Sequence, residues 1–413
     1  MADIEVRPIV DAELAEYLRC VATAFFLEHR EDEETLAFWR DRAGGDFTRR
    51  HAGFVGGNLV GTAGAFAAEL TVPGGETTSI GAITVVTVLP THRRRGVLQS
   101  MMEVQLADAI DRGEVAAMLI AAEWPIYGRY GYGMAIEAAS TVVDTTSARF
   151  RPFEDPGTVT LVSVPELRNV APSVFDAHRR SVAGPITRSE MTWDVELGLR
   201  LRPGGDPPKR RTAVVHRDGG GVVDGYAIYH PKDDWIDNRP AISLDVSELV
   251  TTTDAAYCAL WRFLANIDWV KEVRAGVRAV DEPLRMLVDD GRSVVQRDRS
   301  DHMWLRILDI KAALEARRYE APIDLVVEVD DPLLGHGGRW RLQGDADGAS
   351  ATSTTRSPDI AVTVDALSGA YLGGTPLWWF AQAGKVDERT AGALARLDTA
   401  LRTRRAPWCT TSF

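Results

Sequence analysis

The segment Val86–Gln99 holds the residues whose types and spacing point most clearly to chemistry. It reads VTVLPTHRRRGVLQ, a β-rich run followed by Arg93, Arg94, Arg95 and Gly96 at the start of an apolar-periodic segment. The N–H groups and positive dipole end of a helix start favour an anion, and arginines add charge-assisted hydrogen bonds. The glycine lets such a group approach the backbone closely. The pattern predicts a phosphate site, although the same residues would suit an exposed basic helix start.

The elements around this loop are predicted to be a strand, a helix and a second strand. Val, Ile and Thr dominate Ser79–Leu89, and Pro90 ends this predicted strand because proline cannot donate to a sheet ladder. Apolar residues then recur at helical spacing from Leu98 to Ile110, and the apolar run Val115–Ala122 predicts a strand buried on both faces. Together they form a parallel crossover that holds the arginine loop between the first strand and the helix.

The middle of the chain repeats this plan. Gly219–His230 resembles an earlier hairpin region, Ala241–Val250 resembles the strand before the crossover, and Ala255–Ile267 predicts a helix. The loop between this strand and helix, Thr251–Asp254, contains neither arginine nor glycine. We therefore expect the second unit not to bind the ligand of the first.

From about Ser300 the chain groups strands with helices, which predicts an α+β domain. The expected fold class is α/β and α+β, with domains at residues 1–150, 151–299 and 300–413. Within the last domain, the helical cluster Trp378-Trp379-Phe380 is predicted to be core. The expected strands are Ile323–Val329, Trp340–Leu342, Ala351–Thr355 and Ile360–Val364, and the expected helices are Leu377–Ala383 and Ala391–Arg404.

Composition excludes several classes of function. A net charge of −12 argues against a general binder of nucleic acid or of anionic membranes. Zinc-peptidase, thiol-redox and serine-hydrolase patterns do not occur, so we expect no metal. Neither a signal peptide nor an apolar stretch of membrane-spanning length is visible, which predicts a cytoplasmic location.

Two motifs carry a resemblance to a known family. Arg93–Leu98 resembles motif A of the GNAT N-acetyltransferases, and Leu98, where a small residue is usual, resembles the Eis (enhanced intracellular survival) family of these enzymes. Ile126–Gly133 (IYGRYGYG) resembles the IYGRFGYG signature of that family. The resemblance covers the whole chain and implies two tandem GNAT-like units, the second degenerate, followed by a sterol-carrier-protein-like α+β domain. It also implies a homohexamer.

The resemblance implies acetyl-CoA as the acetyl donor and assigns residues to it. The backbone of one strand would pair with the pantetheine arm, the arginine loop would hold the pyrophosphate, and the end of the next strand would line the far side. In that order these residues are Val86, Thr87 and Val88, then Arg94, Arg95, Gly96, Val97, Leu98 and Gln99, then Ala122 and Glu123. The family often has serine at the position of Ala122 and Gly-Gly in place of Trp124-Pro125.

The resemblance also implies two catalytic groups. Tyr127 matches the general acid, which would protonate a departing thiolate, since a thiol has a pKa of about 8.5. The carboxylate of the last residue, Phe413, would be the general base that takes a proton from the amine. A terminal carboxylate is a weak base, so it needs burial or a water relay for this role.

The implied function is acetylation of amines on aminoglycoside-like polyamines, at one or several positions. Phe25, Phe26, Trp39, Glu28 and His29 are the candidate acceptor contacts. Acetylation of lysines on proteins or peptides is an alternative acceptor class. A lipid-binding or scaffold protein with a decayed transferase site is an alternative of a different class.

Overall fold

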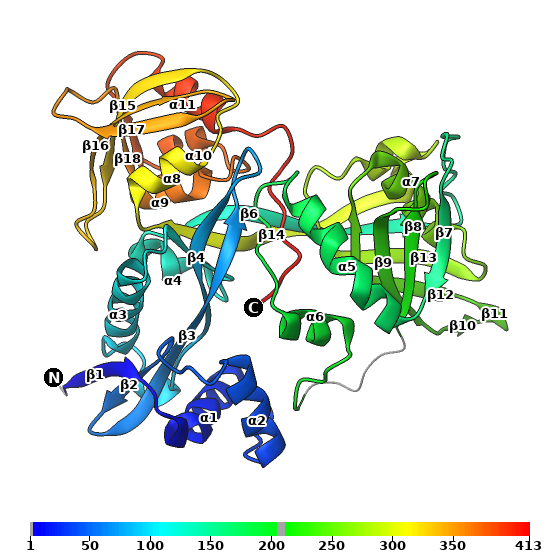
Figure 1. The fold of residues 1–413 in the computed structure, drawn as a ribbon, viewed down its shortest axis with the longest axis horizontal. Coiled ribbons are helices and arrows are strands. Elements are labelled where there is room, and N and C mark those ends of the chain that lie inside the picture. Colours follow the sequence, from blue (N-terminus) through cyan, green and yellow to red (C-terminus); the bar gives the residue numbers. More distant parts are fainter. Residues whose placement is uncertain (1–2, 205–210) are drawn as a thin grey trace.

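The computed structural model describes residues 3–204 and 211–413, and the expected middle domain extends over residues outside these ranges. The described residues form three parts, shown in Figure 1: a first unit in blue and cyan, a second in green, and a C-terminal unit in yellow to red. Within these residues, one sheet of twelve strands runs through the first two units in the order β1-β2-β3-β4-β5-β14-β6-β13-β12-β9-β8-β7.

The first unit contains the arginine loop. Its elements are β1 (Ile4–Pro8), η1 (Asp11–Glu13), α1 (Leu14–Phe25), α2 (Glu33–Arg42), β2 (Arg50–Val55), β3 (Asn58–Thr71), β4 (Thr77–Val88), η2 (Pro90–His92), α3 (Val97–Asp111), β5 (Ala116–Leu119), α4 (Trp124–Tyr127), η3 (Gly128–Tyr130) and β6 (Gly133–Asp144). The expected parallel crossover is confirmed, because β4 pairs in parallel with β5 and α3 lies between them in the chain.

The second unit repeats the crossover. Its elements are β7 (Thr158–Val162), α5 (Val164–Arg179), α6 (Glu190–Leu197), β8 (Thr212–Arg217), β9 (Val223–Lys232), β10 (Trp235–Ile236), β11 (Arg239–Pro240), β12 (Ile242–Thr251), α7 (Asp254–Ala265), β13 (Val270–Arg278), η4 (Pro283–Leu287), η5 (Gly291–Ser293) and β14 (Val294–Ile307). Strands β12 and β13 are parallel, and β13 pairs with β6, so the sheet continues from one unit into the other.

Strand β14 returns from the second unit into the first. It pairs antiparallel with both β5 and β6 and therefore lies between them in the sheet. Figure 1 shows β14 beside β6. The expected domain boundary at residues 299 and 300 falls inside this strand. We therefore propose that the C-terminal unit begins after Ile307 rather than at Ser300.

The C-terminal unit is a five-stranded sheet with helices, as its grouped strands and helices predicted. Its elements are α8 (Ile310–Ala316), β15 (Ile323–Asp330), β16 (Gly338–Gly344), β17 (Ala349–Ser353), β18 (Ile360–Thr363), α9 (Val364–Ala370), α10 (Leu377–Gln382), β19 (Val386–Glu388) and α11 (Ala393–Leu401). One hydrophobic core includes residues of both this unit and the first, among them Leu305 on β14 and Leu367 on α9.

Two local predictions need correction. The strand expected over Val115–Ala122 is only Ala116–Leu119, because its neighbours β4 and β14 pair with it no further than Leu119. The predicted core cluster on α10 is also wrong in part, since Trp378 and Trp379 are 44% and 39% exposed. This six-residue helix buries Leu377 and turns the two indoles outward.

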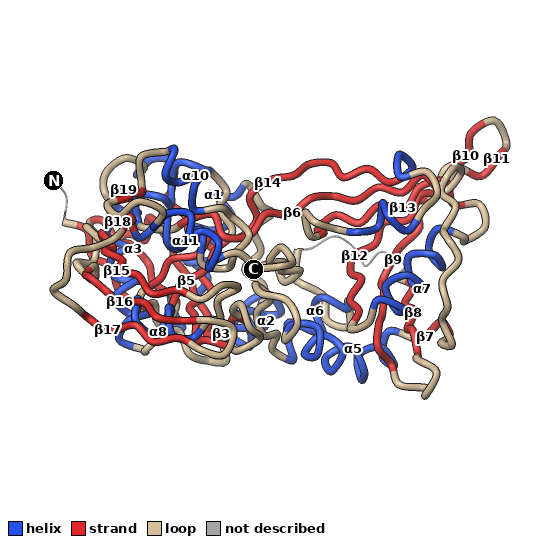
Figure 2. The backbone as a smooth tube through the Cα atoms, turned by 90° about the horizontal axis from the view of Figure 1, so that it is seen from above, coloured by secondary structure: helices blue, strands red, loops and turns tan. Residues whose placement is uncertain are grey.

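The C-terminus lies at the centre of the molecule. In both views of the fold it lies between the first and second units, after the last segment has left α11 and passed between them (Figures 1 and 2). In the described part of the chain, every helix is too short or too polar to cross a bilayer.

Candidate active site

The site begins where β4 and β5 separate. The two strands pair only over Ile80–Ala82 and Ala116–Met118, but β4 continues to Val88. On its other edge, β4 stays bound to β3, where the hydroxyl of Thr62 lies 2.8 Å from that of Thr87. The edge of β4 that faces β5 is therefore open beyond Ala82, as expected for a strand that pairs with an extended ligand.

The arginine loop closes one end of this opening. Arg94 and Gly96 have left-handed backbone conformations, with φ of 62° and 91°, and α3 starts at the next residue. Such a turn directs successive N–H groups toward one point, which suits an anion. The expected phosphate site thus has the predicted local structure.

A cavity of about 780 Å³ runs from this loop to α4 and holds most of the expected donor residues. We call it the donor cavity. Arg95 does not line it, whereas Arg93 and Arg129, which belong to the two motifs but were not assigned to the donor, do. The expected residues that line it are Val86, Thr87, Val88, Arg94, Gly96, Val97, Leu98, Gln99, Ala122 and Glu123.

A second cavity of about 560 Å³ adjoins the first, and we call it the acceptor cavity. Val86, Ala122 and Tyr127 line both cavities. Of the predicted acceptor contacts, the acceptor cavity includes Phe25, Trp39, Glu28 and His29. Phe26 lines the donor cavity instead, because the chain takes a left-handed turn at this residue as α1 ends.

Tyr127 is the tyrosine of its loop that lies at the junction of the two cavities. Its side chain is buried at the end of α4, and its ring meets that of Tyr132 edge to face at 5.9 Å between centroids. Burial raises the pKa of Tyr127 to about 12, so the phenol carries its proton at neutral pH. Tyr130 lines the donor cavity alone, and Tyr132 is fully buried and lines neither.

Phe413 comes to the acceptor cavity from the other end of the chain. It lines the acceptor cavity with Tyr127, and its ring meets Phe66 edge to face at 5.3 Å. The terminal residue is partly buried. The structure therefore brings together the two residues that the resemblance marks as catalytic, 286 positions apart in the chain (413 − 127).

A buried ion pair of the second unit holds the last residues in place. The guanidinium of Arg188 donates to the carboxylate of Glu248 at 2.7 Å and to the hydroxyls of Thr410 and Thr411, both at 2.9 Å. Glu248 also accepts a hydrogen bond from Tyr226 at 2.9 Å. We call these residues the tail clasp. It fixes the backbone two residues before Phe413.

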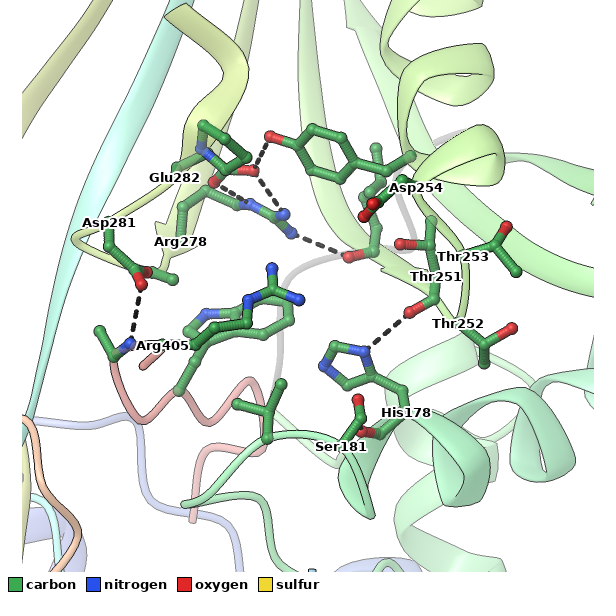
Figure 3. A pocket seen from close by; sticks show the side chains of 17 residues that line it. His178, Ser181, Thr251, Thr252, Thr253, Asp254, Arg278, Asp281, Glu282 and Arg405 are labelled. Carbon is green, nitrogen blue, oxygen red and sulfur yellow. Dashed lines mark hydrogen bonds and ion pairs between the residues drawn. The ribbon is translucent and has the colours of Figure 1, made fainter. Parts of the chain in front are cut away.

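The preceding residues cover the second unit's own crossover. The ring of Trp408 lies under the guanidinium of Arg278 at 4.5 Å and meets His178 edge to face at 5.4 Å. Figure 3 shows Arg278 and His178 at a cavity at the start of α7. This cavity has a volume of about 80 Å³, and Trp408 also lines it. In the second unit, the Thr251–Asp254 loop has the place that the arginine loop has in the first unit. The end of the chain therefore packs at the position that corresponds to the donor cavity of the first unit.

Family models match three stretches of the chain. Residues 5–135 and residues 184–307 each match an acetyltransferase (GNAT) domain, and residues 310–410 match a sterol carrier protein domain. These matches confirm the two tandem GNAT units and the sterol-carrier-like unit that the resemblance implied.

Relatives are similar along most of the chain. An N-acetyltransferase of Streptomyces griseus is 39% identical over 99% of this chain and 100% of its own length. The N-acetyltransferase Eis of Mycobacterium tuberculosis is 34% identical over 84% of this chain and 83% of its own. Among solved structures, Eis1 from Mycobacterium abscessus superposes with a TM-score of 0.85 at 31% identity, covering 99% of this chain and 100% of that one.

Proposed function

The chain belongs to the Eis family of GNAT N-acetyltransferases, and from this premise we propose that Tyr127 and the carboxylate of Phe413 are its general acid and general base. The observation that supports this most directly is that both residues line one cavity beside the open edge of β4. The match to relatives named N-acetyltransferases makes the alternative of a scaffold protein with a decayed site the weaker one.

The donor cavity fits acetyl-CoA, which the GNAT fold uses. We assign the pyrophosphate to the N–H groups of the arginine loop and the pantetheine arm to the open backbone of Val86–Val88. Arg93 and Arg129 add positive charge where the phosphates would lie. With the donor so placed, its thioester reaches the junction at Tyr127.

The reaction is a direct transfer. The amine nitrogen attacks the acetyl carbonyl, the C–N bond forms, and the C–S bond breaks. The carboxylate of Phe413 takes one proton from the ammonium, which frees the nitrogen lone pair for attack, and the phenol of Tyr127 gives its proton to the departing thiolate. The nitrogen loses a second proton as the amide forms, and this proton passes through solvent to restore the phenol. The products are the N-acetylated amine and CoA.

For the acceptor we propose an amine-bearing small molecule, with aminoglycoside-like polyamines as the first candidates and peptide lysines as the second. The acceptor cavity has a volume of about 560 Å³, and its charged lining includes Glu28, which pairs with Arg30, together with Arg202. We also propose, from the family resemblance, that the protein is a cytoplasmic homohexamer and that it acetylates polyamines at one or several positions.

The test is CoA release from acetyl-CoA with kanamycin and with a lysine peptide. We expect Tyr127→Phe and a variant with Gly-Ser added after Phe413 to lose about a hundred-fold or more in kcat/KM, since a positioned acid or base contributes that much. Tyr132→Phe and a Gly-Ser extension at the N-terminus are the matched controls. If both active-site variants turn over like the wild type, these two roles are wrong. If acetyl-CoA itself fails to bind, the donor assignment is wrong as well.

A further inference from the structure

The acceptor cavity continues past Phe413 into a second branch of about 300 Å³. Trp39, Val85, Arg202 and Phe413 line both spaces, so the two are continuous. The walls of the branch are mostly apolar or aromatic, with Leu14, Tyr17 and Phe47 among them. An acceptor whose amine lies at Phe413 therefore has room to extend into this branch.

Three guanidinium groups line the branch, from Arg42 on α2, Arg50 on β2 and Arg202 after α6. The opposite charges that line it are the carboxylate of Glu196 and the terminal carboxylate of Phe413. Positive charge is therefore in excess, even when Phe413 is counted as an anion.

None of these three arginines forms an ion pair with a carboxylate among residues 3–204 and 211–413. Arg50 donates to the carbonyl of Ala65 at 2.8 Å, and the carboxylate of Glu196 attracts Arg42 and Arg202 without forming an ion pair with either. The guanidinium of Arg42 instead lies 5.9 Å from the centroid of the Trp39 ring. Burial, together with the charges of Arg202 and Arg50, lowers the pKa of Arg42 to about 10.

Arg50 is buried, Arg42 is partly buried and Arg202 is exposed. Like charges gathered in this space repel one another, and desolvation adds to the cost for Arg50 and Arg42. A bound anion removes both penalties. The planar guanidinium forms paired hydrogen bonds with a carboxylate or a phosphate, and the apolar walls suit the carbon skeleton between that anion and the amine. A pure polycation, in contrast, would meet repulsion in this branch.

We propose that the acceptor is a primary amine that also carries an oxyanion, a carboxylate or a phosphate, which Arg42 and Arg202 bind while the amine lies at Phe413. This narrows the acceptor class of the proposed function and rests on that function. It predicts that, of two amines that differ only in an anionic group, the amine that carries this group is the better acceptor.

Two amines that differ in the carboxylate alone test the proposal: 4-(aminomethyl)benzoate and 4-methylbenzylamine. For wild type we expect kcat/KM to be about ten- to a hundred-fold higher with the benzoate, as a charge-assisted hydrogen bond allows. Phosphoethanolamine against ethanolamine gives the same comparison for phosphate, and a preference in one pair alone identifies the anion.

Arg42→Gln and Arg202→Gln should each lower the ratio of kcat/KM for the preferred anionic amine to kcat/KM for its neutral counterpart about ten-fold. Arg200→Gln is the matched control, because Arg200 is paired with Asp41 and lines neither branch. Arg42→Lys separates charge from paired hydrogen bonding, and thermal melts confirm that each variant folds.

Equal use of the charged and neutral amines by wild type would overturn the proposal while leaving acetyl transfer intact. If no amine is acetylated, the proposed function fails, and calorimetric titration of 4-(aminomethyl)benzoate then decides the subsite by itself. Binding to wild type that is lost in Arg42→Gln supports it, and no binding to wild type rejects it.

Discussion

At the scale of single residues, the raised pKa of Tyr127 predicts how kcat/KM depends on pH. Burial raises its pKa to about 12 from the usual value of about 10. The folded enzyme therefore keeps the acid form of this residue across the range in which a solvent-exposed phenol would ionise. We predict that kcat/KM shows no alkaline limb from Tyr127 up to about pH 11.

The measurement is kcat/KM against pH from 7 to 10.5, compared between wild type and Tyr127→Phe. The phenylalanine variant should be slower at every pH, and the ratio of the two rates should stay constant. A ratio that falls with an apparent pKa near 10 would mean that the phenol is accessible to water and that its burial plays no part in catalysis.

His178 gives a second residue-scale prediction, on stability. Its Nδ1 lies 2.9 Å from the carbonyl oxygen of Thr251, and burial, the largest cause, lowers its pKa to about 4 (Figure 3). Below the unfolded pKa of about 6.5 the unfolded chain binds a proton that the folded chain does not. Stability is therefore lost as pH falls from 6.5 toward 4.

We expect the wild type to lose about 2 kcal/mol through this residue between pH 7 and pH 5. Urea unfolding of wild type and His178→Gln at both pH values isolates the effect, because other groups titrate alike in the two proteins. The free energy of unfolding of wild type minus that of His178→Gln should be about 2 kcal/mol lower at pH 5 than at pH 7. An unchanged difference contradicts the prediction.

The sequence predicted much of the donor site at this scale, because its residues belong to two short motifs whose order in the chain is also their order in space. The arginines of the second branch had no such signal. Arg42 and Arg202 are 160 positions apart, and neither lies in a pattern that predicts binding. Arg95, in contrast, lies in a motif but does not line the donor cavity. A motif does not indicate which of three adjacent arginines faces the cavity.

At the scale of elements, the tail clasp makes the second unit a support for the first. Removing Arg188 would leave Glu248 buried without its partner, so a milder change gives a cleaner test. Thr411→Val keeps the side-chain shape but removes one acceptor of the guanidinium, which costs about 1 kcal/mol of stability. We expect kcat/KM to fall about ten-fold or more, because a small displacement of a catalytic group is costly.

Acetyl-CoA affinity should be the same in Thr411→Val as in wild type, since the donor cavity does not include this residue. Thr146→Val, which removes a hydroxyl bonded to Asp144 on an exposed turn, is the control for the substitution itself. Equal loss of donor binding and of turnover would indicate general destabilisation and reject a positioning role for the clasp.

Hydrophobic periodicity predicted both crossovers because each is local: a strand, a helix and the next strand follow one another along the chain. The place of β14 was not predictable in this way. Its residues pair with β5 and β6, more than 150 positions earlier, and nothing in its alternation distinguishes that partner from a nearer one. The exposure of Trp378 and Trp379 on α10 was not predicted. Helical spacing identifies the apolar stripe of a helix but does not indicate which of its residues pack against another element.

At the scale of the whole molecule, the shared core links the C-terminal unit to the first. Leu305 and Met118, on strands of the large sheet, belong to the same buried cluster as Leu367 on α9, and the backbone N–H of Ile307 donates to the hydroxyl of Ser368. The buried pair of Arg306 with Asp331 crosses the same boundary at 2.7 Å. A sterol-carrier-like unit joined so closely cannot unfold without exposing the core of the first unit.

We therefore predict that Leu367→Ala destabilises both units in one transition, by about 2–5 kcal/mol, the usual cost of such a cavity. Tryptophan fluorescence and acetyl-CoA binding, followed during the same urea titration, should give one coincident midpoint for wild type and one lower midpoint for the variant. Leu161→Ala, at an exposed leucine of β7, is the matched control and should leave the midpoint in place. If donor binding persists after the fluorescence transition, the units are independent, and the C-terminal unit holds Phe413 at the site without sharing its stability. A common midpoint instead means that the last residue reaches the acceptor cavity only when the whole chain is folded, which couples the position of the proposed general base to the integrity of all three units.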